Sequence, residues 1–174
     1  MTPITELQCA CGQVRFTVDR GPMLSVECCC TSCRTAGAPR IVGPNGATHL
    51  VLYRKDRIHF TKGTDLLKEY RLTPESLTRR IVAICCNTPI CLDFTKGHWL
   101  SLYSCLWSAH TVPPIQMRTM TSDAVEGTIL SDDVPNHKRD AFSFIAKLMS
   151  AWVAMGFKIP KVFVNGTLHV RRGR

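Results

Sequence analysis

The sequence lacks the features that mark secreted and membrane proteins. Its first eight residues contain no basic stretch and no apolar run, so no secretory signal is visible there. The longest apolar region, residues 141–157, is interrupted by Lys147 and is too short to span a bilayer. We also find no glycine-rich phosphate loop, serine nucleophile elbow or metalloprotease helix. These absences favour a cytoplasmic protein with no membrane segment.

Acidic residues are scarce relative to basic ones. Asp and Glu number 13 against 22 Lys and Arg, which gives a formal net charge of +9. Such a balance favours anionic partners, including nucleic acid, acidic thiols and membrane surfaces, without choosing among them. A single-strand binder would interleave exposed aromatic and basic side chains. Most aromatic residues here lie in apolar stretches, which disfavours nucleic acid as a partner.

Short β-rich segments separated by turns predict a mainly β protein. We expect strands at 13–18, 24–28, 48–53, 57–60, 66–72, 77–84 and 99–106, and a final strand at 161–170. Residues 119–136 are polar and read as a long connection. The strands before this connection define an expected β domain over residues 1–118, and residues 119–174 form a C-terminal extension.

Apolar residues at helical spacing predict one amphipathic helix in that extension, at about 137–156. Asn136 is its expected N-cap, because a side-chain oxygen there can accept from free amides of the first turn. Gly156 suits the C′ position, and Pro160 prevents continuation. We expect the apolar stripe, which includes Ile145 and Met149, to pack as core on the same domain.

Ten cysteines fall in four places rather than at random. They are Cys9 and Cys11; Cys28, Cys29, Cys30 and Cys33; Cys85, Cys86 and Cys91; and Cys105. In a reducing compartment, clustered cysteines are more often metal ligands or reactive thiols than disulfides. The cysteines therefore direct the functional interpretation.

The segment 28–33 is the most informative cluster. On an extended strand Cys28 and Cys30 share a face, and a turn can bring Cys33 back to the same point. Three thiolates from one segment fill three corners of a tetrahedron. Structural zinc takes four protein ligands, whereas catalytic zinc keeps three and an open position. Either this is an open zinc site, or a distant ligand closes it, or the thiols are inert.

A second half-site is formed by Cys9 and Cys11, which the one-residue spacing places on one face of a strand. It needs a partner pair, and the candidate is Cys85 with Cys86. A four-thiolate site would then join the N-terminal strand to the end of a later one. The alternative for the adjacent pair is a strained vicinal disulfide, which a reducing compartment disfavours.

Three motifs in order now resemble a known family. They are Cys-x-Cys-Gly-x-Val-x-Phe at 9–16, Cys-x-Cys-x-x-Cys-Arg at 28–34, and Cys-Asn-Thr-Pro at 86–89. Together they resemble the glutathione-dependent formaldehyde-activating enzyme family, which includes centromere protein V, and a bacterial branch with Cys-Cys-Asn-Thr-Pro in particular. The resemblance runs from about residue 7 to about residue 107, so the C-terminal helix lies outside it.

The resemblance implies a fold of several coiled antiparallel β-sheets, like that of the small zinc-binding regulators of Rab proteins. It implies up to two zinc ions. The active site would use Cys28, Cys30 and Cys33, whereas the structural site would use the remaining motif cysteines: Cys9, Cys11, Cys86 and Cys85. The family chemistry is addition of a thiol, typically glutathione, to formaldehyde, or the reverse carbon–sulfur cleavage.

One departure concerns the late motif, which in the family is Cys-x-x-Cys-Gly. Ala83 stands where its first cysteine is expected. Cys85 can replace it only through a local turn, because adjacent residues on a strand point in opposite directions. Otherwise Cys91 would have to reach in. Asn87 replaces the glycine and tolerates a positive φ. The sequence alone does not decide whether Cys85 or Cys91 is the fourth ligand.

The sequence therefore predicts a zinc-dependent carbon–sulfur lyase-like protein acting on a small thiol adduct. Arg34 and Arg40 lie near the active motif and are candidate contacts for a carboxylate-bearing thiol, although arginines are most often simply solvated. The rival interpretation is a non-enzymatic, zinc-stabilised module that binds nucleic acid or a protein.

Overall fold

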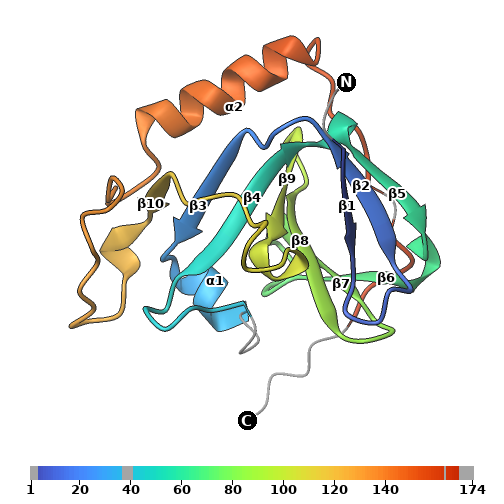
Figure 1. The fold of residues 1–174 in the computed structure, drawn as a ribbon, viewed down its shortest axis with the longest axis horizontal. Helices are drawn as coiled ribbons and strands as arrows, with labels where there is room; N and C mark the ends of the chain where they lie inside the picture. Colours follow the sequence, from blue (N-terminus) through green and yellow to red (C-terminus); the bar gives the residue numbers. More distant parts are fainter. Residues whose placement is uncertain (1–3, 37–40, 163, 169–174) are drawn as a thin grey trace. The chain divides into compact units, whose positions relative to one another are not determined.

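The computed structural model describes residues 4–36, 41–162 and 164–168 of the 174. The described part is mainly β, as predicted, with one long helix near the C-terminus (Figure 1). It divides into two compact units. Unit 1 comprises the described residues of Met1–Gly21, Tyr53–Leu102 and Lys158–Arg174, and unit 2 comprises those of Pro22–Leu52 and Tyr103–Phe157.

The first sheet of unit 1 is antiparallel and has the order β1 (Ile4–Gln8), β2 (Arg15–Asp19), β5 (Ile58–Lys62). Phe16 and Val18 are fully buried, which confirms the predicted alternation. Gly63 follows the last residue of β5 and has a φ of +72°. A Cβ there would lie 2.4 Å from the Gln13 carbonyl oxygen, so only glycine fits.

The other strands of unit 1 are neighbours in the order β6 (Leu67–Tyr70), β7 (Thr78–Ala83), β8 (Thr88–Phe94), β9 (Trp99–Tyr103). All of these pairings are antiparallel. The C-terminal segment runs beside β6, where Glu69 and Thr167 form an isolated parallel bridge. The predicted strand at 161–170 is therefore wrong for its described residues; residues 163, 169 and 170 lie outside them.

Unit 2 is built on β3 (Leu24–Cys28), which pairs antiparallel with β4 (Thr48–Arg54) and parallel with β10 (Met117–Thr119). Leu24, Val26 and Cys28 share one face of β3, and the first two are buried. The short helix α1 (Thr31–Ala36) follows β3 directly. The cysteine at the end of β3 thus lies where a strand gives way to a helix.

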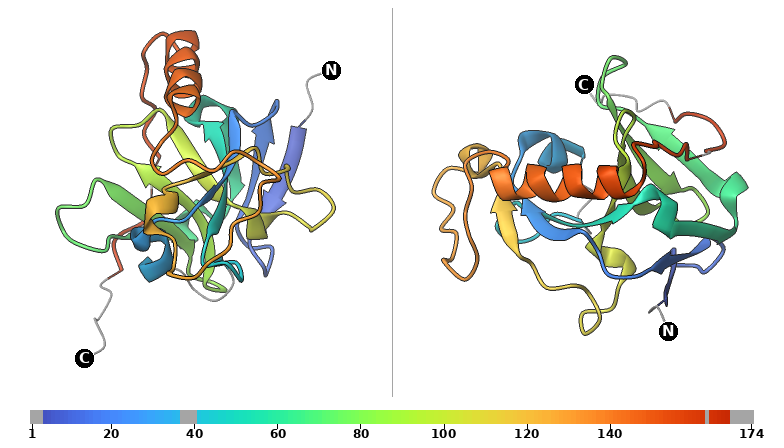
Figure 2. Two further views of the ribbon diagram at one scale, coloured as in Figure 1. Left: turned by 90° about the vertical axis from the view of Figure 1, so that its left-hand side faces the viewer. Right: turned by 90° about the horizontal axis from the view of Figure 1, so that it is seen from above.

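Helix α2 (Phe142–Ala154) lies at the opposite end of the β3–β4 pair from α1 (Figures 1 and 2). It begins later than predicted, with Ala141 rather than Asn136 as its N-cap. The reason is that Asn136 bridges to Arg118 beside β10, and its amide donates to the Ser131 carbonyl oxygen. Gly156 has φ +61°, which confirms its predicted C′ position.

The apolar stripe of α2 is not uniformly buried. Leu148 is 6% exposed, whereas Ile145 and Met149 are 44% and 46% exposed. The expectation that the whole stripe packs as core is therefore wrong for these two residues. No helix within the described ranges is long and apolar enough to cross a membrane.

Candidate metal centres

The first cysteine cluster lies in unit 1 and contains four thiols. The Sγ atoms of Cys9, Cys11, Cys85 and Cys86 all lie within 4.8 Å of one another. The separations are 3.6 Å for Cys9–Cys11, 3.7 Å for Cys9–Cys85, 3.4 Å for Cys11–Cys85 and 3.8 Å for Cys85–Cys86. Tetrahedral zinc with Zn–S bonds of about 2.3 Å requires S···S separations of about 3.8 Å. The donor set and its spacing fit that ion.

The β1–β2 turn positions the first two thiols of this cluster. The Cys9 amide donates to the Val14 carbonyl oxygen (3.0 Å), and the Gly12 amide donates to the Cys9 carbonyl oxygen (2.9 Å). Gly12 can take the required φ of +70° because it has no Cβ. The Val14 amide also donates to the Cys9 Sγ (3.3 Å). Amide donors of this kind stabilise a thiolate.

The turn between β7 and β8 supplies the other two thiols. Residues 84–87 leave the strand conformation, and Asn87 has φ +54°. Because Cys85 and Cys86 are in a turn rather than a strand, adjacent side chains can converge on one point. This is the local turn that the sequence required for Cys85 to stand in for Ala83. Cys91 does not reach the cluster, since it is fully buried in β8 opposite Ile81.

The two adjacent thiols differ in acidity. Burial opposes ionisation of Cys86, but hydrogen bonds from the Thr88 hydroxyl and from Cys11 outweigh it and lower the pKa of Cys86 to about 6. Burial raises the pKa of Cys85, and its contacts with the Cys11 and Cys9 thiols raise it further. One negative charge is therefore concentrated on Cys86 in the absence of a cation.

The second cluster lies in unit 2 and contains three thiols, those of Cys28, Cys30 and Cys33, with Sγ atoms within 4.8 Å of one another. Within the described ranges no further cysteine, histidine or carboxylate joins this group. Cys28 ends β3, and Cys33 lies in the first turn of α1. The predicted turn at 31–32 is thus the start of a helix. The Cys33 amide donates to the Cys30 carbonyl oxygen (3.1 Å) and Sγ (3.3 Å).

Ionisation in this cluster is concentrated on Cys30. Hydrogen bonds from the Cys28 and Cys33 thiols lower the pKa of Cys30 to about 2. The same contact with Cys30 raises the pKa of Cys28 to about 11, and contacts with Cys28 and Cys30 raise the pKa of Cys33. Three thiols around one negative charge form a pre-assembled site for a soft cation.

Two threonines flank Cys28, and neither carried a signal in the sequence. Thr48 is its partner in the β3–β4 register, and Thr119 is its partner in the β3–β10 register. Partners in a ladder share a face of the sheet. Thr48 is fully buried, and its Oγ1 has no hydrogen-bond partner among the described residues. A buried hydroxyl is therefore available on the face that carries the Cys28 thiol.

Charged residues also approach the three-thiol cluster. Burial raises the pKa of Asp140, and the negative charge on Cys30 raises it further, so this carboxyl lies close enough to sense the site. Arg34 Nη1 donates to the carbonyl oxygens of Cys29 and Asp123, both at 2.9 Å. Arg34 thereby ties α1 to a distant loop. Arg40, the other predicted contact, lies outside the described residues.

The remaining cysteines are separate from both clusters. Cys29 is buried, and its amide donates to the Thr119 carbonyl oxygen. Cys91 is buried, whereas Cys105 is exposed. All ten cysteines, each of which lies in the described ranges, are free of disulfide bonds.

The fold and the two clusters define a mainly β protein with a four-thiol and a three-thiol site, each able to hold a metal ion. The family model described as glutathione-dependent formaldehyde-activating enzyme matches residues 4–103, and the chain belongs to that family. All seven clustered cysteines lie within the matched region. This result confirms the family that the three motifs indicated.

A solved structure is similar to part of the chain. It is the crystal structure of a Rhodobacter sphaeroides protein, 13% identical, with a TM-score of 0.48, and the match covers 64% of this chain and 97% of that one. No curated protein matches this chain in sequence.

Proposed function

We propose that the protein is a zinc-dependent enzyme of carbon–sulfur chemistry, which adds a small thiol such as glutathione to formaldehyde or cleaves the resulting adduct. The observation that carries this proposal is the contrast between the two clusters. Four thiols converge in unit 1, whereas three converge in unit 2 with no fourth ligand among the described residues. Three protein ligands leave one position for a substrate.

The number of thiol ligands in each cluster assigns its zinc a structural or a catalytic role. Cys9, Cys11, Cys85 and Cys86 would hold a structural zinc, and Cys28, Cys30 and Cys33 would hold the working one. A bound zinc supplies Lewis acidity toward a carbonyl oxygen or a thiolate at its open position. In the addition, a C–S bond forms, the C=O double bond becomes a single bond, and the thiol proton ends on the oxygen.

The protein's own groups position the reactants. Thr48 offers a hydroxyl on the same face as Cys28, where it can donate to an oxygen that gains negative charge. Burial of this hydroxyl excludes competing water. Arg34 fixes the helix that carries Cys33 through its bonds to backbone carbonyl oxygens. Whether Arg40 contacts a substrate carboxylate stays a prediction.

Ten free cysteines support a reducing compartment, and we propose the cytoplasm. In that setting glutathione is an abundant thiol, and the excess of basic residues attracts its carboxylates. Glutathione and formaldehyde are the first pair to test because the description of the family names both.

The test compares the wild-type protein with Cys33→Ser and with the control Cys105→Ser, which changes an exposed cysteine outside both clusters. Native mass spectrometry counts zinc, and NMR exchange spectroscopy measures the rate at which glutathione and formaldehyde exchange with their adduct. We expect two zinc ions and accelerated exchange in the wild type and control. Cys33→Ser should retain one zinc ion, remain folded and lose the acceleration.

Two results would contradict the proposal. Unchanged zinc content in Cys33→Ser would show that the three-thiol cluster is not a metal site. Two bound zinc ions without acceleration would favour the alternative, a zinc-stabilised module that binds a macromolecule. A shift of labelled nucleic acid that weakens steeply with salt would then identify the partner as nucleic acid.

A further inference from the structure

A cavity in unit 1 has no role in the chemistry proposed above. Its volume is about 680 Å³, and it lies between strands β6–β8 and the C-terminal segment from residue 159 to residue 167. No cysteine is among its lining residues. A volume of this size is within the range of small-molecule sites in proteins.

The floor of the cavity is a network of buried and half-buried charges. Asp93 is fully buried and forms ion pairs with Lys55 (2.8 Å) and Arg79 (2.6 Å). Arg79 also pairs with Glu69 (2.7 Å), which in turn pairs with Arg71 (3.4 Å). Charges are costly to bury unless they are paired and hydrogen-bonded. Asp93 meets that condition through its two ion pairs. Arg71 does not line the cavity, so the lining itself carries three cations, Lys55, Arg79 and Lys161, against two carboxylates, Glu69 and Asp93.

The charges of the floor balance one another, and the excess positive charge of the lining comes from Lys161, an exposed residue of the wall. Lys55 is 6% exposed; its Nζ donates to the Gly97 carbonyl oxygen (2.7 Å) and forms the ion pair with Asp93. Charges with low-dielectric surroundings are weakly screened by salt. The floor is neutral, and Lys161 supplies the charge that attracts one negative charge from a molecule that enters the cavity.

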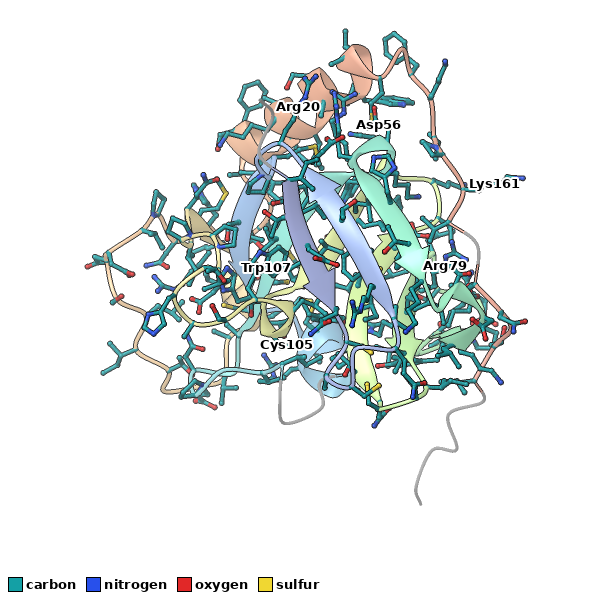
Figure 3. The ribbon with its side chains drawn as sticks, turned by 45° about the vertical axis from the view of Figure 1, so that its right-hand side comes forward. Arg20, Asp56, Arg79, Cys105, Trp107 and Lys161 are labelled. Carbon is teal, nitrogen blue, oxygen red and sulfur yellow. The ribbon has the colours of Figure 1, made fainter. Side chains whose placement is uncertain are left out.

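The outer wall is apolar and held in place. Ile159, Val162 and Val164 line it. Arg79 Nη2 donates to the Val162 carbonyl oxygen (2.8 Å), which joins the wall directly to the charged floor. Figure 3 labels Arg79 and Lys161 on the side of unit 1 where this segment runs. The wall thus combines apolar contact with the ammonium group of Lys161.

Backbone hydrogen bonds fix the same segment along β6. The Asn165 amide donates to the Leu67 carbonyl oxygen (2.8 Å), the Glu69 amide to Gly166 (3.1 Å), and the Leu168 amide to Glu69 (2.7 Å). Strand β7 and the C-terminal segment are both hydrogen-bonded to β6, so the cavity is formed before a ligand arrives. Preformed sites lose less entropy on binding.

The wall also lies outside the region that defines the family. The family model ends at residue 103, whereas the apolar wall begins at residue 159. The cavity is therefore assembled from the family core and from this chain's own extension. Its ligand need not be the thiol or the aldehyde of the proposed reaction.

We propose that this cavity binds a small organic monoanion, a carboxylate with an apolar body. The carboxylate is placed against Lys161, the cation by which the lining exceeds its two carboxylates, and the apolar body packs on Ile159 and Val164. A phosphate dianion fits less well, because it would exceed the charge available and leave the apolar wall uncovered. This inference does not rest on the proposed enzyme activity.

The experiment uses the full-length, zinc-loaded protein and three probes with one shared ring system. They are the anion naphthalene-1-carboxylate, the neutral naphthalen-1-ylmethanol and the cation naphthalen-1-ylmethylammonium, titrated by calorimetry. We expect one saturable site for the anion, binding of the neutral alcohol at least about tenfold weaker, and no detectable binding of the cation.

Val164→Glu places a carboxylate in the wall and should weaken binding of the anion at least about tenfold through like-charge repulsion. The matched control Ile129→Glu makes the same charge change at a residue that is 94% exposed and outside the cavity, and it should bind like the wild type. Val164→Lys adds a cation instead and should retain or strengthen binding.

Several outcomes would overturn the proposal: no saturable binding of the anion, equal affinity for the anion and the alcohol, or unchanged affinity in Val164→Glu. Binding that disappears in Cys33→Ser would assign the probe to the three-thiol cluster and also overturn it. If circular dichroism shows that Val164→Glu is unfolded, two measurements still test the proposal. They are the affinities of the wild type for the three probes and the affinity of Val164→Lys for the anion.

Discussion

Cys28 and Thr48 face one another across the β3–β4 ladder, and the Thr48 hydroxyl is buried with no hydrogen-bond partner among the described residues. An unsatisfied buried hydroxyl lowers the stability of the folded state. Such a group is expected where function compensates for the cost. The pair therefore connects the strand register of unit 2 to the chemistry of the three-thiol site.

Thr48→Val should separate function from stability. Because the methyl group replaces a hydroxyl that has lost water without gaining a partner, we expect the free energy of unfolding to stay equal or rise by about 1 kcal/mol. The acceleration of adduct exchange should fall about tenfold or more, since a donor to the reacting oxygen is lost. Urea unfolding and exchange NMR measure the two effects. Thr48→Ser, which keeps the hydroxyl, should behave like the wild type, and full activity in Thr48→Val would refute the role.

Cys86→Ser tests the four-thiol cluster. A structural zinc contributes directly to folding, so we expect loss of the chelator-resistant zinc and a loss of about 3 kcal/mol or more in unfolding free energy. Native mass spectrometry and thermal melting report the two quantities. Cys105→Ser serves as the control and should melt within about 2 °C of the wild type. A Cys86→Ser protein with unchanged zinc and melting temperature would exclude Cys86 as a ligand.

Zinc affinity at the three-thiol site should depend steeply on pH. The pKa of Cys28 is raised to about 11, and that of Cys33 is also raised, so both thiols are protonated at neutral pH while Cys30 is ionised. Zinc binding must then release two protons, and affinity should fall about 100-fold for each pH unit of acidification between pH 8 and pH 6. Competition with a chelator measures the slope. A flat profile would show that the thiols are already ionised.

Asp93→Asn should destabilise unit 1 strongly. The substitution keeps the shape of the side chain but leaves Lys55 and Arg79 buried without their shared carboxylate. Removing one partner of a buried ion pair costs about 3–5 kcal/mol. The control is Asp56→Asn, which breaks a partly exposed pair with Arg54 and should cost less than about 1 kcal/mol. Similar losses in urea unfolding for both variants would contradict the assigned burial.

The cysteine clusters were predictable because the spacing of metal ligands can be read from the sequence. The convergence of Cys85 and Cys86 on the same point as Cys9 and Cys11 was not predictable. Cys85 and Cys86 looked incompatible with one ion as long as residues 77–84 were continued as a strand. The turn that resolves this depends on a positive φ at Asn87, which a sequence indicates only weakly. Thr48 and Asp140 were missed for another reason. They come from distant segments, and only the strand register and the path after β10 bring them near Cys28 and Cys30.

The strands were predicted where alternation or a clear apolar run was present, and missed where neither was. β10 has only three residues, and β8 contains Pro89, a residue that is uncommon in strand interiors. In the structure Pro89 lies beside the register shift at Ile81 and Val82, where proline is tolerated. Helix α1 was read as a turn because its six residues are too few to show a period. These errors arise from tertiary context rather than from local propensity.

The four-thiol cluster joins residues that are 76 positions apart in the chain, as the Cys9–Cys85 pair shows. During synthesis the first two cysteines leave the ribosome several seconds before the second two, at typical elongation rates of about 5–20 residues per second. For that interval Cys9 and Cys11 can bind a metal ion only incompletely, and closing the long loop costs entropy that the ion must offset. Zinc supply should therefore matter most while the chain is being made. A nascent protein starved of zinc would fail to mature, whereas the finished protein would resist the same chelator.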